Sequence, residues 1–211
     1  MKYMEFLSTL RRNKVCIFSL RDIENIFPDA NVATLKNNLT NWRKKGYIGR
    51  LKRDLYECVE PVLESAIPDF YIANRLYTPS YISLETALSL YNIIPEIAAQ
   101  VTSVTTRPSR EFKNQHGVFM YRSCKKRAFT GYRIVSYEGY KVLMADEEKA
   151  LVDFLYFKLR HGLSIDFDEE RFDEDVLKGI EWKKAREYAE LFNKVTINKL
   201  KDCRNWLELK C

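Results

Sequence analysis

The stretch NNLTNWRKKGYIGRLKRDLYEC, residues 37–58, is the most informative part of the sequence for the amino-terminal fold. Its first half has the apolar spacing of a helix that ends at Gly46, because glycine readily takes the left-handed backbone found just after a helix. Its second half predicts two strands, over residues 47–51 and 55–59, joined by a turn at residues 52–54. The stretch therefore predicts a helix followed by a β-hairpin with a cationic tip.

Two more helices and a short strand are predicted ahead of this stretch. The apolar spacing of YMEFLSTLRR, residues 3–12, predicts the first helix, with Met4 on its apolar side. The run VCIF, residues 15–18, predicts a short strand or an extended link. Ser19 is the expected N-cap of a second helix over residues 20–27, and the following proline ends that helix.

The third helix, from about Asn31 to Gly46, is predicted to be amphipathic. Its apolar stripe consists of Val32, Leu35, Leu39 and Trp42. Its outer face and flanks carry amides, hydroxyls and cations, namely Thr34, Lys36, Asn37, Thr40, Asn41, Lys44 and Lys45. Asparagine can pair bidentately with adenine and lysine can reach guanine or phosphate, so this face suits the major groove of DNA.

The order helix, short strand, helix, turn, helix, hairpin is that of a winged helix-turn-helix, which we predict for residues 1–60. The hairpin is then the wing, and its residues Arg50, Lys52 and Arg53 are predicted to contact phosphates or a minor groove. Two other interpretations stay open. An exposed helix face is polar in most proteins, and winged helices also bind other proteins.

Composition argues against several classes of protein. The chain has 211 residues, is 46% hydrophobic and contains 13 Tyr and 12 Phe, so we expect a packed core and little disorder. No run approaches the roughly 18 apolar residues of a membrane span, and the amino terminus lacks the features of a secretion signal. The 5 cysteines are scattered and form no CxxC pair, which favours free thiols over disulfides or a zinc site. We therefore expect a cytoplasmic protein without a membrane partner.

The net charge of +6 is sorted along the chain into alternating blocks. Residues 1–60 and 100–145 carry +5 and +7, whereas residues 61–99 and 146–211 carry −3 each. Such sorting favours two surfaces that meet polyanions. The second surface is predicted from Arg107, Arg110, Lys113, Arg122, Lys125, Lys126, Arg127 and Arg133. Such a surface would extend a DNA footprint, and the alternative is a rim of solvated charge.

Residues 61–211 are predicted to form a second domain of mixed α/β type, which makes the whole chain α+β. Its strand-like runs are AAQVTSVTTR, GVFMYRS, TGYRIVSY and YKVLMA. They predict a small, mainly antiparallel sheet, with YEGY at residues 137–140 as a tight turn. Helices flank this sheet. Ser83 is the expected N-cap of one, and residues 146–148 place three acids at the start of another, where they complement the helix dipole.

Two phrases of the second domain carry a family resemblance. LYTPSYISLETALSLYNIIPE, residues 76–96, and VLMADEEKALVDFLYF, residues 142–157, resemble the antitoxin family of AbiE-type (type IV) toxin–antitoxin systems. The resemblance covers about residues 5–160 and includes the winged helix ahead of the phrases. The family's wing usually reads RGLY, whereas here Asp54 puts a negative charge at the tip. Asn92 stands where the family often has glycine, a mild change because asparagine also tolerates the left-handed conformation.

The resemblance implies an AbiEi-like antitoxin that represses its own operon. Its expected partners are double-stranded DNA, at operator repeats in its own promoter, and a toxin of nucleotidyltransferase type. The toxin is expected to be neutralised without a stable complex, and the second basic surface could serve this through nucleic acid shared with the toxin. The alternatives are a stand-alone winged-helix transcriptional regulator without a toxin partner and a nuclease-like enzyme.

Enzymatic activity is not expected from the residues themselves. His116 and His161 each precede a glycine in a predicted loop, away from cysteines or carboxylates at ligand spacing. The acidic run at residues 167–176 lacks the glycine and alternating oxygen ligands of a calcium loop. Glu147 and Lys149 form the ExK pair of some nucleases, but helical spacing is expected to place Lys149 on an exposed face. We therefore predict no catalytic residue, no metal site and no cofactor.

Overall fold

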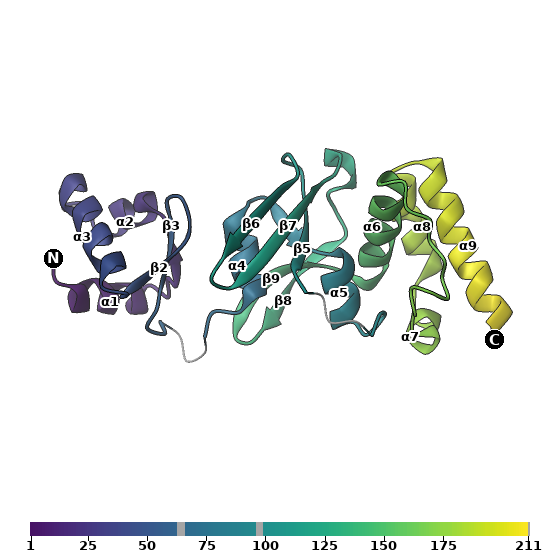
Figure 1. Ribbon diagram of the computed structural model, residues 1–211, viewed down its shortest axis with the longest axis horizontal. Helices are drawn as coiled ribbons and strands as arrows, with labels where there is room; N and C mark the ends of the chain where they lie inside the picture. The colour runs from purple at the N-terminus through teal and green to yellow at the C-terminus, as the bar shows by residue number, and fades with distance from the viewer. Residues whose placement is uncertain (63–65, 96–98, 211) are drawn as a thin grey trace.

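The computed structural model describes residues 1–62, 66–95 and 99–210. It is an α+β protein with a small antiparallel sheet, a larger mixed sheet and accompanying helices. Figure 1 shows three parts along the long axis: an amino-terminal unit, the larger sheet in the middle and a group of carboxyl-terminal helices. The two ends of the chain therefore lie at opposite ends of the molecule.

The amino-terminal unit, residues 1–60, combines helices with the small sheet. Its elements are α1 (Tyr3–Arg12), β1 (Ile17–Phe18), α2 (Leu20–Ile26), α3 (Val32–Lys44), β2 (Ile48–Lys52) and β3 (Leu55–Cys58). The strands lie in the order β1-β3-β2, and both neighbouring pairs are antiparallel. This is the order of elements that the sequence predicts, with the hairpin turn at Arg53 and Asp54.

Capping residues fix where the second and third helices begin. Ser19 Oγ accepts the Asp22 N–H at 3.2 Å and the Asp22 carboxylate accepts the Ser19 N–H at 2.7 Å, which confirms Ser19 as the N-cap. Asn31 Oδ1 accepts the Ala33 N–H at 2.9 Å and so caps α3. Both helices then bury apolar residues in the core of this unit, which contains Phe6, Leu7, Leu10, Phe18, Ile23, Leu35, Leu39, Trp42, Ile48 and Cys58.

Two residues predicted on the apolar stripes are exposed. Met4 is 63% exposed and Val32 is 43% exposed. Both lie in the first turn of their helices. The apolar spacing is therefore right for the middle of each helix and wrong at its beginning.

The second unit is built on a sheet of six strands. Its elements are α4 (Asp69–Leu76), β4 (Ser80–Ile82), α5 (Leu84–Leu90), β5 (Val101–Thr105), β6 (Arg110–Asn114), β7 (Gly117–Ser123), the 3-10 helix η1 (Lys126–Ala128), β8 (Tyr132–Tyr137), β9 (Tyr140–Ala145), α6 (Glu147–Arg160), α7 (Glu174–Lys178), α8 (Trp182–Glu190) and α9 (Lys194–Lys210). The strand order is β6-β7-β5-β4-β9-β8.

The prediction of a mainly antiparallel sheet holds for the pairs β4–β5, β6–β7 and β8–β9, but the prediction of a small sheet is wrong. The sheet is larger and mixed, because β4 pairs in parallel with β9 and β5 pairs in parallel with β7. Two strands of this sheet carry no clear signal in the sequence: β4 is short, and β6, with the sequence REFKN, is mostly charged. Inserting β4 between β5 and β9 creates one of the parallel pairings and joins the two halves of the sheet.

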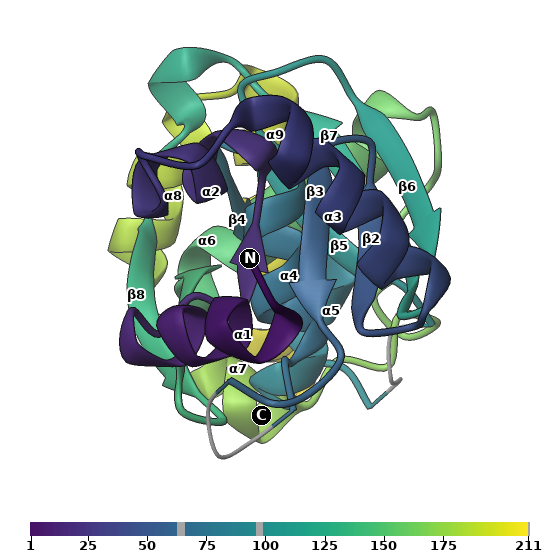
Figure 2. The same cartoon turned by 90° about the vertical axis from the view of Figure 1, so that its left-hand side faces the viewer.

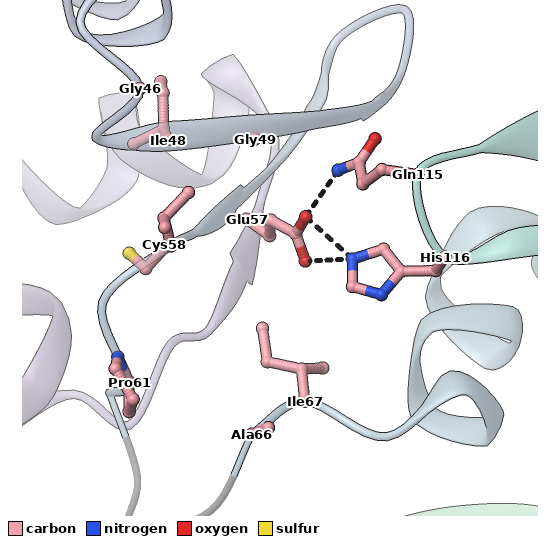
Figure 3. A pocket seen from close by; sticks show the side chains of 11 residues that line it. Gly46, Ile48, Gly49, Glu57, Cys58, Pro61, Ala66, Ile67, Gln115 and His116 are labelled. Atoms are coloured by element: carbon pink, nitrogen blue, oxygen red, sulfur yellow. Dashed lines mark hydrogen bonds and ion pairs between the residues drawn. The ribbon is translucent and has the colours of Figure 1, made fainter.

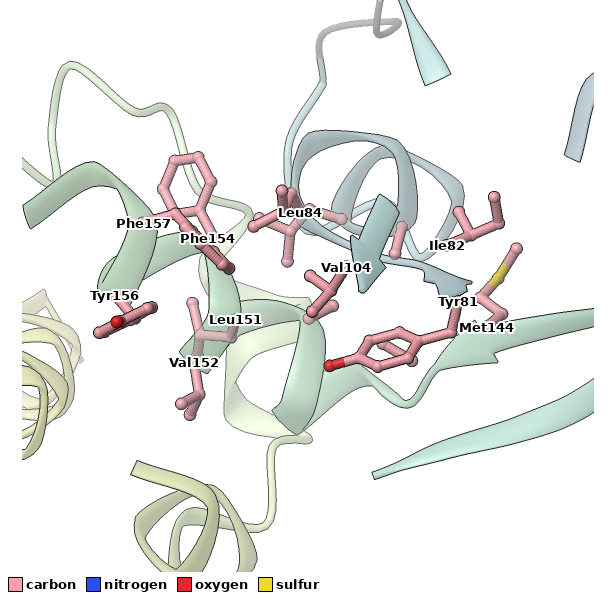
Figure 4. Close-up of a cluster of buried hydrophobic side chains, with 14 of the residues drawn as sticks. Tyr81, Ile82, Leu84, Val104, Met144, Leu151, Val152, Phe154, Tyr156 and Phe157 are labelled. Atoms are coloured by element: carbon pink, nitrogen blue, oxygen red, sulfur yellow. The ribbon is translucent and has the colours of Figure 1, made fainter. Parts of the chain in front are cut away.

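Helix α6 is buried on nearly all sides, between the sheet and the carboxyl-terminal helices (Figure 4). Its Lys149 and Asp153 side chains are 0% exposed and form an ion pair. The hydroxyls of Tyr81 and Ser83 also donate to the Asp153 carboxylate, at 3.0 and 2.8 Å. The expectation that Lys149 lies on an exposed face is therefore wrong, because helical spacing does not reveal that both sides of this helix are covered.

The small sheet of the amino-terminal unit docks onto the second unit. Ile17, Leu51 and Leu55 belong to the hydrophobic core of the second unit rather than to that of their own. Asn114 Nδ2, at the end of β6, donates to the Leu51 carbonyl at 3.3 Å. The two units therefore share a continuous apolar contact. No helix in the described ranges is both long and apolar enough to cross a membrane.

Candidate nucleic-acid interface

The outer face of α3 brings the predicted contact residues together. Thr34, Lys36, Asn37, Thr40, Asn41, Lys44 and Lys45 are all exposed. Thr40 Oγ1 donates back to the Lys36 carbonyl at 2.9 Å, within the helix. In the part of the chain that the structure describes, the side chains of Asn37, Asn41, Lys44 and Lys45 have no hydrogen-bond or ion-pair partner. Their polar groups are available to a ligand.

The three predicted hairpin cations have different roles in the structure. Arg53 is exposed at the turn and has no partner among the described residues. Arg50 is exposed, and its Nε donates to the Lys52 carbonyl at 3.3 Å. The Lys52 ammonium instead donates to the Leu76 carbonyl at the end of α4, where a cation complements the helix dipole. Lys52 therefore joins the two units, and it does not present its charge at the tip as the sequence predicted.

Two arginines of the second unit lie next to Lys52. Burial lowers the pKa of Lys52, and the positive charges of Arg107 and Arg110 lower it further. Lys52 Nζ and the Arg110 guanidinium lie 5.6 and 5.0 Å from the centre of the Phe112 ring, and the Arg107 guanidinium lies 4.8 Å from that of Tyr77. The hairpin and the beginning of β6 therefore form one cationic region.

The second basic surface predicted from the sequence is divided between distant places. Arg110 and Lys113 lie on β6, at one edge of the six-stranded sheet, and Arg133 lies on β8, at the other edge. Figure 2 shows α3, β2 and β6 on one side of the molecule and β8 on the opposite side. Arg133 pairs with Glu147 at 3.3 Å. Arg122 lies on β7, and Lys125, Lys126 and Arg127 lie at η1. In sequence, these elements come after β6 and before β8.

The three cations at η1 differ in their contacts. Lys125 and Lys126 are exposed and have no partner in the described ranges. Arg127 donates from Nε to the Leu191 carbonyl at 2.8 Å and from Nη2 to the Phe192 carbonyl at 3.2 Å. These carbonyls follow the end of α8, so Arg127 caps that helix.

The Arg127→Ala variant is expected to lose about 1–2 kcal/mol of unfolding free energy, because two charge-assisted hydrogen bonds to backbone carbonyls disappear. Lys126→Ala is the matched control and is expected to change stability by less than about 0.5 kcal/mol, as at other exposed sites. Urea unfolding of both variants measures the difference. Equal midpoints for the two variants would contradict a capping role for Arg127.

Among the residues described, no group of three or more His, Cys, Asp or Glu side chains could hold a metal ion. Glu147 faces Arg133, whereas Lys149 is buried with Asp153, so the ExK pair does not share a site.

Comparison of the chain with protein-family models and with curated proteins finds no match.

A polar cluster lies between the two units, and the sequence did not predict it. Glu57 of β3 contacts Gln115 and His116, which form the β6–β7 turn. His116 is separated from Glu57 by 59 positions, and no local pattern signals such a contact. His116 therefore has a carboxylate partner that its sequence neighbours do not reveal.

Proposed function

We propose that this chain is a DNA-binding transcriptional repressor in which residues 1–60 act as a winged helix-turn-helix. In this proposal α3 lies in the major groove and the β2–β3 hairpin is the wing. The main support for this proposal is that the two faces of α3 differ. One face packs into the core, while the opposite face presents amides and ammonium groups that have no partner among the described residues. Such groups match base edges and phosphates.

The second unit extends the DNA footprint in this proposal. Arg107 and Arg110 lie close to Lys52 of the hairpin that carries Arg53. Strand β6, which begins at Arg110, lies on the same side of the molecule as α3 (Figure 2). Phosphates follow each other closely along a duplex, so cations on neighbouring elements can bind successive ones. Lys125 and Lys126 lie farther along the chain at η1, and we assign them no part in this footprint.

We further propose that the repressor is an antitoxin, as the resemblance to the AbiE-type family implies. The two family-like phrases meet in the core, because Tyr81 and Ser83 of the first donate to Asp153 of the second. The segments that carry the resemblance are thus in contact with each other. The proposed DNA site is a repeat in the protein's own promoter, and the proposed partner is a nucleotidyltransferase-type toxin.

Alanine at Asn37 and Asn41 is expected to weaken binding to the operator more than binding to a random duplex. Each lost bidentate base contact costs about 1–3 kcal/mol. Lys44→Ala is the control on the same face, and it should weaken both complexes alike and flatten the salt slope by about one unit. Anisotropy titrations at several salt concentrations give both quantities. Operator preference that survives alanine at both asparagines would exclude base reading by these residues.

The antitoxin role can be tested separately, by identifying the gene next to the one that encodes this chain. A neighbouring nucleotidyltransferase-like gene whose expression arrests growth, with rescue by this chain, is the expected result. Absence of such a neighbour would favour a stand-alone transcriptional regulator that uses the same DNA-binding surface.

A further inference from the structure

The amino-terminal unit places a buried carboxylate at its contact with the second unit. The Glu57 side chain is only 8% exposed. Gln115 Nε2 lies 2.6 Å from Glu57 Oε1, and His116 Nε2 lies 2.8 and 2.9 Å from the two carboxylate oxygens (Figure 3). A buried charge is costly unless its hydrogen bonds are made, and both partners come from the other unit. Separation of the two units would therefore leave the Glu57 carboxylate without these partners.

The β6–β7 turn that supplies these partners is itself held in place. The His116 N–H donates to Asn114 Oδ1 at 2.8 Å, and Asn114 Nδ2 donates to the Leu51 carbonyl of β2. His116 Nδ1 lies 3.6 Å from the Asp69 carboxylate at the start of α4. The imidazole thus lies between one carboxylate of each unit.

Gly49 makes room for this arrangement. It faces Glu57 across the β2–β3 pair. A Cβ at this position would lie 2.5 Å from Glu57 Oε1 and 2.9 Å from Gln115 Nε2. Any larger residue would displace the carboxylate or the amide, so a glycine is required for the observed contact.

The remaining contacts between the units are of two kinds. Lys52, Asn114 and Arg75 donate across the contact to the carbonyls of Leu76, Leu51 and Ile17, at sites that are only partly buried. Ile17, Leu51 and Leu55 bury apolar surface, and apolar contact has no preferred direction. Hydrogen bonds to a buried carboxylate, by contrast, have a preferred direction. The cluster of Glu57, Gln115 and His116, which we call the interunit clamp, is therefore suited to set the angle between the units.

We infer that the interunit clamp is a positioning device, which holds α3 and the cations Arg107 and Arg110 at the angle needed to contact one duplex together. The inference rests on the proposed DNA-binding function. Strand β6 connects the arginines to the interunit clamp. It begins at Arg110 and ends at the turn whose residues contact Glu57. Rotation of the amino-terminal unit against β6 separates α3 from these arginines.

The orientation of the units can be measured without DNA. Residual dipolar couplings of the full chain are expected to fit one alignment tensor for both units in the wild type, and two tensors in His116→Ala and Gly49→Ala. Gly49→Ala acts by displacement and leaves every charge in place. Glu60→Gln and His161→Ala are the controls, because Glu60 pairs with Arg11 of its own unit and His161 is exposed. A single shared tensor, unchanged in both clamp variants, would overturn the inference whether or not the protein binds DNA.

Operator binding gives the second measurement. Removing Arg107 and Arg110 together is expected to lower affinity about 60-fold at roughly 0.1 M salt, from two lost phosphate contacts. The same double replacement should have little further effect in His116→Ala, because the arginines no longer approach the duplex together with α3. A full effect in both backgrounds would refute the positioning role while leaving the proposed function intact. Absence of any specific DNA binding would instead refute the proposed function, and the orientation measurement would then decide on the clamp alone.

Discussion

The Asp153→Ala variant is expected to lose about 3–5 kcal/mol of unfolding free energy, the largest loss of stability we predict for a single replacement. The reason is that Lys149 stays buried in α6 without its counter-charge. The hydroxyls of Tyr81 and Ser83 also lose their acceptor. Urea unfolding measures the loss as a fall in the midpoint.

The exposed pair of Arg186 and Glu190 in α8 provides the control for this replacement. Both pairs have the same spacing along a helix, but this one is solvated. Glu190→Ala is expected to cost less than about 0.5 kcal/mol. The double variant Lys149→Met, Asp153→Leu should recover much of the stability lost in Asp153→Ala, because it leaves no unpaired charge. Similar losses for Asp153→Ala and Glu190→Ala would contradict a buried ion pair.

Charge reversal next to the hairpin is expected to have the largest effect on DNA binding. Glutamate at Arg53, Arg107 and Arg110 removes three proposed phosphate contacts. Each lost contact takes about 0.9 from the slope of log K against log salt, so the three lower affinity by roughly 500-fold at about 0.1 M salt. Repulsion by the new carboxylates adds to this loss.

The matched control reverses Lys125, Lys126 and Lys141, which are exposed residues outside the β2–β3 hairpin and β6. It changes the net charge by the same amount, so any effect of overall charge appears in both variants. Thermal unfolding of both proteins checks that they are folded. An equal loss of affinity in the two triple variants would show that DNA responds to net charge and not to this region.

Local signals explain what the sequence predicted well. Ser19 and Asp22 form a capping box within four residues of each other, and the α3 stripe repeats at helical spacing. The turn between β8 and β9 is marked by Gly139, whose φ of 82° suits glycine. Each of these features depends on neighbours in sequence, and sequence patterns carry that information.

The features that the sequence predicted poorly depend on contacts between residues far apart in the chain. Lys149 was expected to be exposed because spacing along one helix does not show that a sheet and other helices cover both its faces. Lys52 was expected at the wing tip, yet its ammonium reaches Leu76. His116 and Glu57 meet only after β6 and β7 have formed a hairpin and the two units have docked. The candidate surface on α3 was thus accessible to sequence reasoning, whereas the contacts between units were not.

In the proposed function, α3 reads the sequence of DNA. The most direct test is titration of the purified full chain against the DNA upstream of its own gene, with excess random duplex as competitor. If α3 reads the sequence, binding is expected to saturate and to protect a repeat. The Asn37→Ala, Asn41→Ala variant is expected to lose its preference for this repeat. Binding that the competitor removes equally from every sequence would contradict this proposal.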